Sequence, residues 1–150
     1  MTDDTAAESL VVRRVLPAPR ERVFAAWLDP VSLAQWMRPG ATTETLVEVD
    51  ARVGGRFRIL MRHEGNQDFE HRGEYLVIQP PSLLSFTWIS AATDLQPTVV
   101  TVEFLERGAN TELVLTHRRL PPSQLESHRR GWTDILRNLG DMLAVGQLPG

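Results

Sequence analysis

The 150-residue sequence predicts an α+β fold in which one antiparallel sheet packs against a single long helix. The first observation is the segment 121–145, where apolar side chains recur at the spacing of one helix face. The second is the alternation of apolar and polar residues through most of 44–117. A helix with so broad an apolar face needs an equally broad partner, and only a sheet is available. We therefore expect a bent sheet covered by this helix, with a pocket between them.

The N-terminal third predicts one strand followed by two short helices. The stretch Leu10–Leu16 is apolar apart from two arginines, which is typical of a strand. Pro19 marks the start of a first helix, and Asp29 can cap a second one that carries Trp36 on its buried side. Pro39 and the glycine after it end this second helix.

The middle of the chain predicts about six further strands, which brings the sheet to six or seven strands in all. Glycine and proline pairs at 54–55 and 80–81 mark turns between them. Because side chains alternate between the two faces of a strand, each strand presents one apolar set to the helix. The strands expected from this alternation cover residues 45–49, 56–62, 69–77, 84–88, 100–104 and 113–117.

The long C-terminal helix is predicted to start just after a proline pair. Ser123 and Glu126 have the spacing of a capping box. Its apolar face is expected to comprise Leu125, His128, Trp132, Ile135, Leu136, Leu139, Met142 and Leu143.

Four blocks of sequence, in this order, resemble the SRPBCC (START-like) superfamily. The blocks are 19–36, 49–58, 72–75 with the prolines 80–81, and Gly131-Trp132 with the leucines after it. The chain is most similar to the branch related to the C-terminal domain of activators of the heat-shock-protein-90 ATPase. This resemblance implies a helix-grip fold: a strongly bent antiparallel sheet wrapped around a long C-terminal helix, with two short helices after the first strand. We predict one such domain over residues 1–150, with an ordered core from about residue 9 to residue 146.

The inward faces predict a ligand-binding cavity between the sheet and the C-terminal helix. Aromatic side chains are concentrated on these faces, so the favoured function is binding of a small apolar or aromatic molecule. The expected ligand-binding residues are Trp36, Phe57, Ile59, Met61, Phe69, His71, Tyr75, Phe86, Trp88, Val102, Phe104, His117, Trp132, Leu136 and Leu139.

Three polar residues on the same faces leave an enzymatic alternative open. His71 and Tyr75 share one strand face, and His117 lies on another strand of that face. If the three converge, they could act as acid and base, as in the polyketide cyclases and aromatases of the superfamily. The sequence favours a binding protein over an enzyme, and we assign no catalytic residue.

Composition excludes several classes of site. The chain has no cysteine, so thiolate catalysis and sulfur-ligated zinc are ruled out. The basic residues are all arginine, which excludes lysine nucleophiles. The histidines are scattered along the sequence, so we expect neither a metal site nor a cofactor.

Composition also narrows the partners. A formal charge of −3 argues against nucleic acid, and no apolar run is long enough to cross a membrane. We expect a cytoplasmic protein. A chaperone ATPase is a third candidate partner, on the resemblance alone, and homodimerisation stays open.

Overall fold

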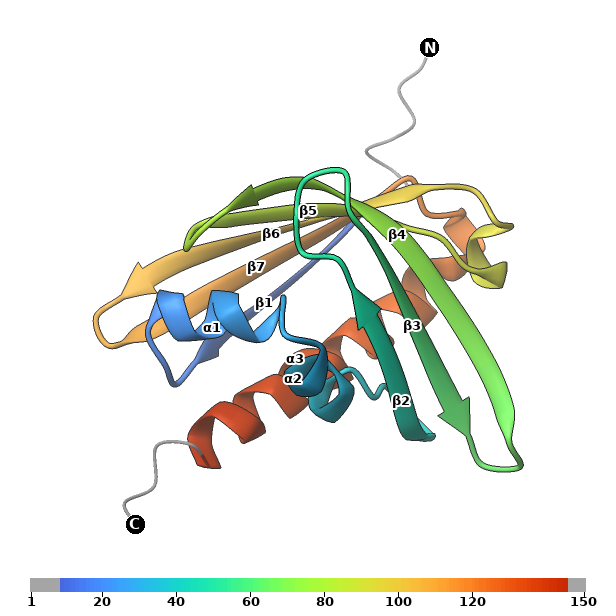
Figure 1. Cartoon of the computed structure of the whole chain (residues 1–150), viewed down its shortest axis with the longest axis horizontal. Helices are drawn as coiled ribbons and strands as arrows, with labels where there is room; N and C mark the ends of the chain where they lie inside the picture. The colour runs from blue at the N-terminus through green and yellow to red at the C-terminus, as the bar shows by residue number, and fades with distance from the viewer. Residues whose placement is uncertain (1–8, 146–150) are drawn as a thin grey trace.

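The chain, described here over residues 9–145 of a computed structural model, folds into a curled sheet with a long helix running beneath it (Figure 1). Two short α-helices, α1 and α2, follow the first strand. The elements are β1 (Leu10–Leu16), α1 (Arg20–Ala26), α2 (Pro30–Trp36), β2 (Thr42–Val49), β3 (Arg56–His63), β4 (Gln67–Gln79), β5 (Leu83–Trp88), η2 (Ala91–Thr93), β6 (Thr98–Arg107), β7 (Asn110–Arg118), η3 (Pro122–Gln124) and α3 (Leu125–Val145).

The sheet has the strand order β1-β7-β6-β5-β4-β3-β2, and all neighbouring strands are antiparallel. Strands β1 and β2 therefore form its two edges. The helix α3 packs along β1, while α2 packs against β2 and α3. The predicted α+β helix-grip fold, with its bent antiparallel sheet and long C-terminal helix, is confirmed.

The short helices begin where the sequence predicts. The Asp29 carboxylate accepts a hydrogen bond from the backbone nitrogen of Ser32 at 3.1 Å, which caps α2. The entry to α3 differs from the prediction. Ser123 lies inside the 3-10 turn η3, and α3 begins after this turn at Leu125. The two prolines that precede Ser123 favour the extended backbone and tight turn seen there.

The inward faces follow the predicted alternation through most of the sheet. On β3, for example, Phe57, Ile59 and Met61 are buried between exposed or half-buried neighbours. The alternation breaks in β4, where a bulge between Tyr75 and Val77 shifts the register. Beyond this bulge Ile78 packs against the core, although the alternation had placed Val77 on the inward face.

Gly73 allows the sheet to close over one aromatic ring. It pairs with Phe57 across β3 and β4, and a Cβ atom there would lie 2.4 Å from Cζ of that ring. The same Cβ would lie 2.0 Å from the backbone oxygen of Thr87 on β5. A residue without a side chain is therefore needed where these three strands approach one another.

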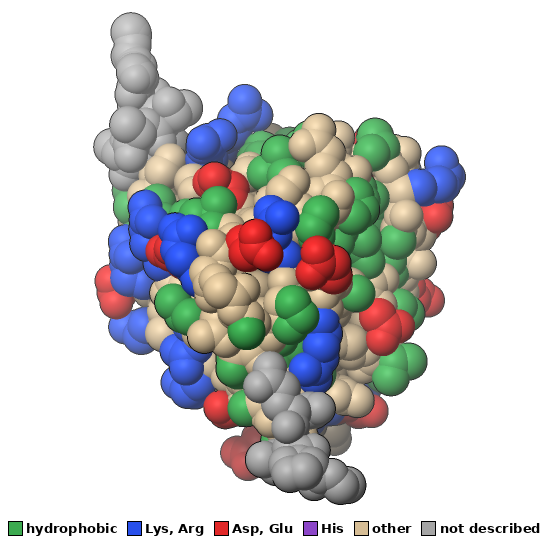
Figure 2. All heavy atoms as spheres, turned by 90° about the vertical axis from the view of Figure 1, so that its left-hand side faces the viewer, with side chains coloured by type: hydrophobic (Ala, Val, Ile, Leu, Met, Phe, Trp, Pro, Cys, Tyr) green, Lys and Arg blue, Asp and Glu red, His purple; other side chains and the backbone are tan. Residues whose placement is uncertain are grey.

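The outside of the molecule is mixed in character. On the face shown in Figure 2, hydrophobic side chains are interspersed with acidic and basic ones. Within residues 9–145, no helix is long and apolar enough to cross a membrane.

Candidate functional site

The centre of the molecule is filled by aromatic rings. Trp27 lies in the middle, with ring centroids 4.8 Å from Trp36, 6.3 Å from Phe86 and 6.4 Å from Trp132. The space left among these rings on the side of Tyr75 is a cavity of about 20 Å³. Such a volume holds at most about one water molecule. The predicted pocket therefore does not occupy the centre of the fold.

An open cleft of about 600 Å³ lies instead at one end of the sheet, beside the N-terminal half of α3. Its sheet wall comes from β3, β4 and β5, and the loop after α2 contributes Pro39 and Gly40. Pockets that hold small molecules commonly measure about 300–1,000 Å³. Along α3 the cleft is lined by residues 126–135, among them Trp132, which also belongs to the core.

A chain of hydrogen bonds fixes the indole of Trp132. Its Nε1 donates to Nδ1 of His117 at 3.0 Å. The Oγ1 of Thr98 lies 2.8 Å from Nε2 of His117 and donates its own proton to the backbone oxygen of Trp88 at 2.6 Å. Because the Thr98 hydroxyl donates its proton to the Trp88 carbonyl, its oxygen must accept the hydrogen bond from His117. Nε2 of His117 therefore carries a proton. His117 is thus neutral and joins α3 to strands β7, β6 and β5.

Burial lowers the pKa of three histidines at or near the cleft, His71, His117 and His128. Desolvation lowers the pKa of His117 to about 3 and that of His71 to about 4. It also lowers the pKa of His128, whose Nδ1 donates to the backbone oxygen of Gln124 at 3.0 Å. The His71 ring in the cleft wall and the His117 ring behind Trp132 are therefore neutral near pH 7.

Two polar atoms in this wall lack a partner. Nε1 of Trp88 and Nδ1 of His71 are both buried without a hydrogen bond among the described residues. Their rings lie side by side, with centroids 4.8 Å apart. Backbone carbonyls of Ile59 and Phe69 act on the His71 ring and offset part of the lowering of its pKa.

The predicted ligand-binding residues separate into four groups. Met61, His71, Trp88 and Trp132 line the cleft. Phe57, Ile59, Tyr75 and Phe86 surround the small internal cavity, together with Trp88. A third group is buried in the core and lines neither space: Trp36, Val102, Phe104, His117, Leu136 and Leu139.

Phe69 forms the fourth group. It is 38 % exposed and packs on His63, with ring centroids 4.6 Å apart. Alternation places it correctly on the face of His71, but it lies near the tip of the hairpin between β3 and β4. Its side chain therefore remains accessible to solvent.

Sequence reasoning left two cleft histidines, His63 and His128, out of the ligand-binding set. His128 lies four residues before Trp132 on α3, so the two side chains share one face of the helix. This spacing is the sequence signal for His128. Two histidines that are distant in the sequence come together in the fold. His117 packs on His128, with ring centroids 5.3 Å apart. Even so, no group of three metal-ligating side chains forms within residues 9–145.

The three polar groups named for an enzyme do not converge. His71 lies in the cleft, whereas Tyr75 lies at the internal cavity with Phe57 between them: the Phe57 ring is 5.5 Å from Tyr75 and 6.1 Å from Trp88. His117 is saturated by its bonds to Trp132 and Thr98. This set therefore supplies no acid–base pair around a shared substrate position.

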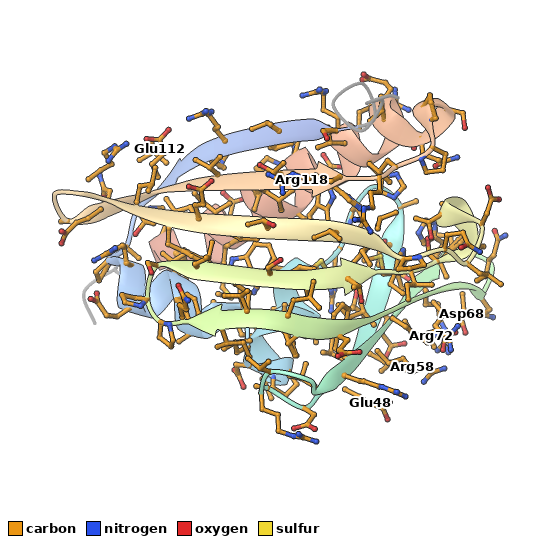
Figure 3. The ribbon with its side chains drawn as sticks, turned by 90° about the horizontal axis from the view of Figure 1, so that it is seen from above. Glu48, Arg58, Asp68, Arg72, Glu112 and Arg118 are labelled. Atoms are coloured by element: carbon orange, nitrogen blue, oxygen red, sulfur yellow. The ribbon has the colours of Figure 1, made fainter. Side chains whose placement is uncertain are left out.

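Several charged residues of β3 and β4 form ion pairs with one another. Arg58 pairs with Glu70, and Arg62 pairs with Asp68 at 2.9 Å and with Glu44 of β2 at 3.2 Å. Glu48, Arg58, Asp68 and Arg72 lie toward the same end of the sheet in Figure 3. Exposed ion pairs of this kind contribute little to stability. We assign them no ligand.

A comparison with protein-family models identifies one family. The family model described as "Activator of Hsp90 ATPase homolog 1-like protein" matches residues 17–144. No curated protein matches the chain significantly.

Several solved structures have the same fold. A protein from Chromobacterium violaceum is 27% identical, with a TM-score of 0.81 and coverage of 91% of this chain and 96% of that chain. An HSP90 activator from Plasmodium falciparum is 28% identical, with a TM-score of 0.72 and the same two coverages, 91% and 96%. A protein from Rhodobacter sphaeroides is 22% identical, covers 95% of this chain and 97% of that chain, and has a TM-score of 0.83, which supports the fold alone.

Proposed function

Because the chain belongs to the family of activator of Hsp90 ATPase homolog 1-like proteins, we propose that it uses that family's fold to bind a small, mainly aromatic molecule in the cleft beside Trp132. The observation that carries this proposal is an open space of about 600 Å³ whose inner wall consists of neutral rings and apolar side chains. Charged side chains such as Glu126 and Arg130 lie on exposed positions of α3 at its rim.

The shape of the wall supports a flat apolar occupant. The rings of Trp88 and Trp132 lie 5.1 Å apart at an angle of 53°, and Met61 and Ile135 contribute flexible aliphatic surface beside them. An aromatic ligand can pack on such rings in offset or edge-to-face geometry, which contributes about 0.5–1.5 kcal/mol per ring pair beyond the burial of area.

Titration with N-phenyl-1-naphthylamine, an uncharged dye that fluoresces in apolar surroundings, tests the proposal. We expect saturable binding with one site per chain. Ala92 is exposed and lines the cleft, so Ala92→Trp should fill the cleft from outside and weaken binding at least tenfold.

Ala91→Trp is the matched control. Ala91 is exposed on the same 3-10 turn but does not line the cleft. Equal dye binding by both variants, or no saturable binding by the unmodified protein, would contradict the proposal.

A second function, stimulation of a chaperone ATPase, is supported by the family and by the similarity to an HSP90 activator. If the protein acts in this way, adding it to purified Hsp90 should raise the rate of ATP hydrolysis. An unchanged rate together with no detectable complex would rule this function out.

A further inference from the structure

We propose that the occupant of the cleft carries an uncharged oxygen on its aromatic body and that this oxygen accepts a hydrogen bond from Nε1 of Trp88. This inference rests on the proposed function and deepens it by naming the chemistry of the ligand. It follows from the two unpaired polar atoms in the cleft wall and from the absence of charge beside them.

The indole of Trp88 is the first part of the argument. The residue is 3% exposed, and its Nε1 has no acceptor among the described residues. An indole N–H can only donate. A buried donor without an acceptor destabilises the fold by about 1–3 kcal/mol, so an acceptor that arrives with a ligand restores a missing bond. Trp88 lines both the cleft and the small internal cavity, so a ligand in the cleft contacts its indole ring.

His71 supplies the second part. Its Nδ1 is also buried without a hydrogen bond of standard geometry, although the backbone carbonyls of Ile59 and Phe69 act on the ring, and the ring lies 4.8 Å from that of Trp88. A neutral imidazole nitrogen can either donate or accept, depending on the tautomer. A ligand hydroxyl fits both atoms, since its oxygen accepts from Trp88 while its proton is donated to His71. A carbonyl oxygen fits Trp88 alone, or both atoms when Nδ1 is protonated in the neutral ring.

The oxygen is uncharged because nothing in the inner wall would compensate a carboxylate. The rings that pack on Trp88 are those of Phe57, His71, Phe86 and Trp132, and the pKa of His71, about 4, leaves its ring neutral near pH 7. Moving a carboxylate from water to such a site without a cation is strongly unfavourable. Phenols and aryl ketones are therefore the expected class.

A pair of ligands of equal size tests the inference. 2-Naphthol carries a hydroxyl where 2-methylnaphthalene carries a methyl group, and both can displace N-phenyl-1-naphthylamine from the cleft. In the unmodified protein 2-naphthol should bind more tightly. In Trp88→Phe, which keeps an aromatic ring but lacks the N–H, the preference should fall roughly fivefold, the effect of one neutral hydrogen bond.

Trp27→Phe is the matched control. Nε1 of Trp27 is likewise buried and unpaired, and the residue is 2% exposed, but it lines the internal cavity and not the cleft. The preference for 2-naphthol should be unchanged in this variant. An equal preference in the unmodified protein and Trp88→Phe, with both ligands bound, would overturn the inference and leave the proposed function standing. Failure of the dye and of both ligands to bind the unmodified protein would overturn both.

A measurement on the unmodified protein makes the result independent of the stability of the variants. With ¹⁵N-labelled tryptophan the protein gives one indole N–H signal for each of its 4 tryptophans. The signal of Trp88 is identified as the one that Trp88→Phe lacks, or by sequential assignment if that variant does not fold. It should move downfield with 2-naphthol and not with 2-methylnaphthalene. Equal movement with the two ligands would overturn the inference.

Discussion

Nε1 of Trp132 donates a hydrogen bond to Nδ1 of His117 across 3.0 Å, and this contact holds the wall of the cleft to the sheet. His117 is completely buried and passes the connection on to Thr98. A histidine that is saturated in this way cannot also serve a ligand. Sequence reasoning placed His117 among the ligand contacts, but in the structure it positions Trp132, which lines the cleft.

We expect His117→Phe to destabilise the protein by about 2 kcal/mol, because the buried indole N–H of Trp132 loses its acceptor. Urea unfolding of the two single variants, His117→Phe and Trp132→Phe, and of the double variant gives the coupling between the residues. This coupling should be about 1 kcal/mol. Strictly additive effects would contradict the role given to this bond.

The buried histidines predict a loss of stability in acid. The pKa of His71 is lowered to about 4 and that of His117 to about 3, from an ordinary value of 6.5. At pH values between the folded and the ordinary pKa of each histidine, the unfolded chain binds protons that the folded chain does not. The free energy of unfolding therefore falls as the pH falls. Each histidine contributes at most about 1.4 kcal/mol per pH unit. The stabilising effect of the neutral rings is complete above the unfolded pKa.

Unfolding titrations between pH 7 and about 4.5 measure this slope while most carboxylates stay ionised. The slope should be smaller for His117→Phe than for the unmodified protein, by the contribution of one histidine. His117 faces His128 on α3, whose own pKa is also lowered by burial, so the slope that remains in His117→Phe includes the contribution of His128. Identical slopes in the two proteins would show that His117 is not the group that resists protonation.

The fold could be predicted from the sequence, but the position of the cleft could not. Alternation assigns each strand residue to a face, and this was sufficient to place Phe57, Met61 and Trp88 inward. It does not say how far along the strand the helix reaches. Phe69 and Met61 share a face and even pair across β3 and β4, yet one is exposed and the other buried.

The filling of the centre was also beyond sequence reasoning. Trp27, the C-cap residue of α1, packs its ring among Trp36, Phe86 and Trp132, and this occupies the space between sheet and helix. The outcome depends on the angle at which α1 and α3 meet the sheet, which periodicity does not contain. The open space is displaced to the end of α3, where His63 and His128 join residues from the predicted set.

Gly73→Ala should destabilise the protein by about 3 kcal/mol, because its methyl group would overlap the Thr87 carbonyl and the Phe57 ring. Thermal or urea unfolding measures the change. Adding Phe57→Leu should not restore stability, since the backbone oxygen of Thr87, 2.0 Å from the new atom, cannot move away alone. Full recovery in the double variant would mean that the ring is the sole obstacle.

Gly131→Ala should have the opposite effect and stabilise the protein by about 0.5–1 kcal/mol. Gly131 lies within α3, and the nearest atom that a new Cβ would meet is Cβ of Pro39, at 3.8 Å. Alanine therefore fits without strain and removes the flexibility that glycine gives to the unfolded chain. Gly140→Ala in the same helix is the comparison. Its new Cβ would lie 3.4 Å from Cδ2 of Leu16, so this variant should gain less stability.

Gly131 and Pro39 both line the cleft, so dye binding should weaken in Gly131→Ala even as the unfolding temperature rises. An increase in stability with unchanged affinity for the dye would show that the dye does not bind next to Gly131.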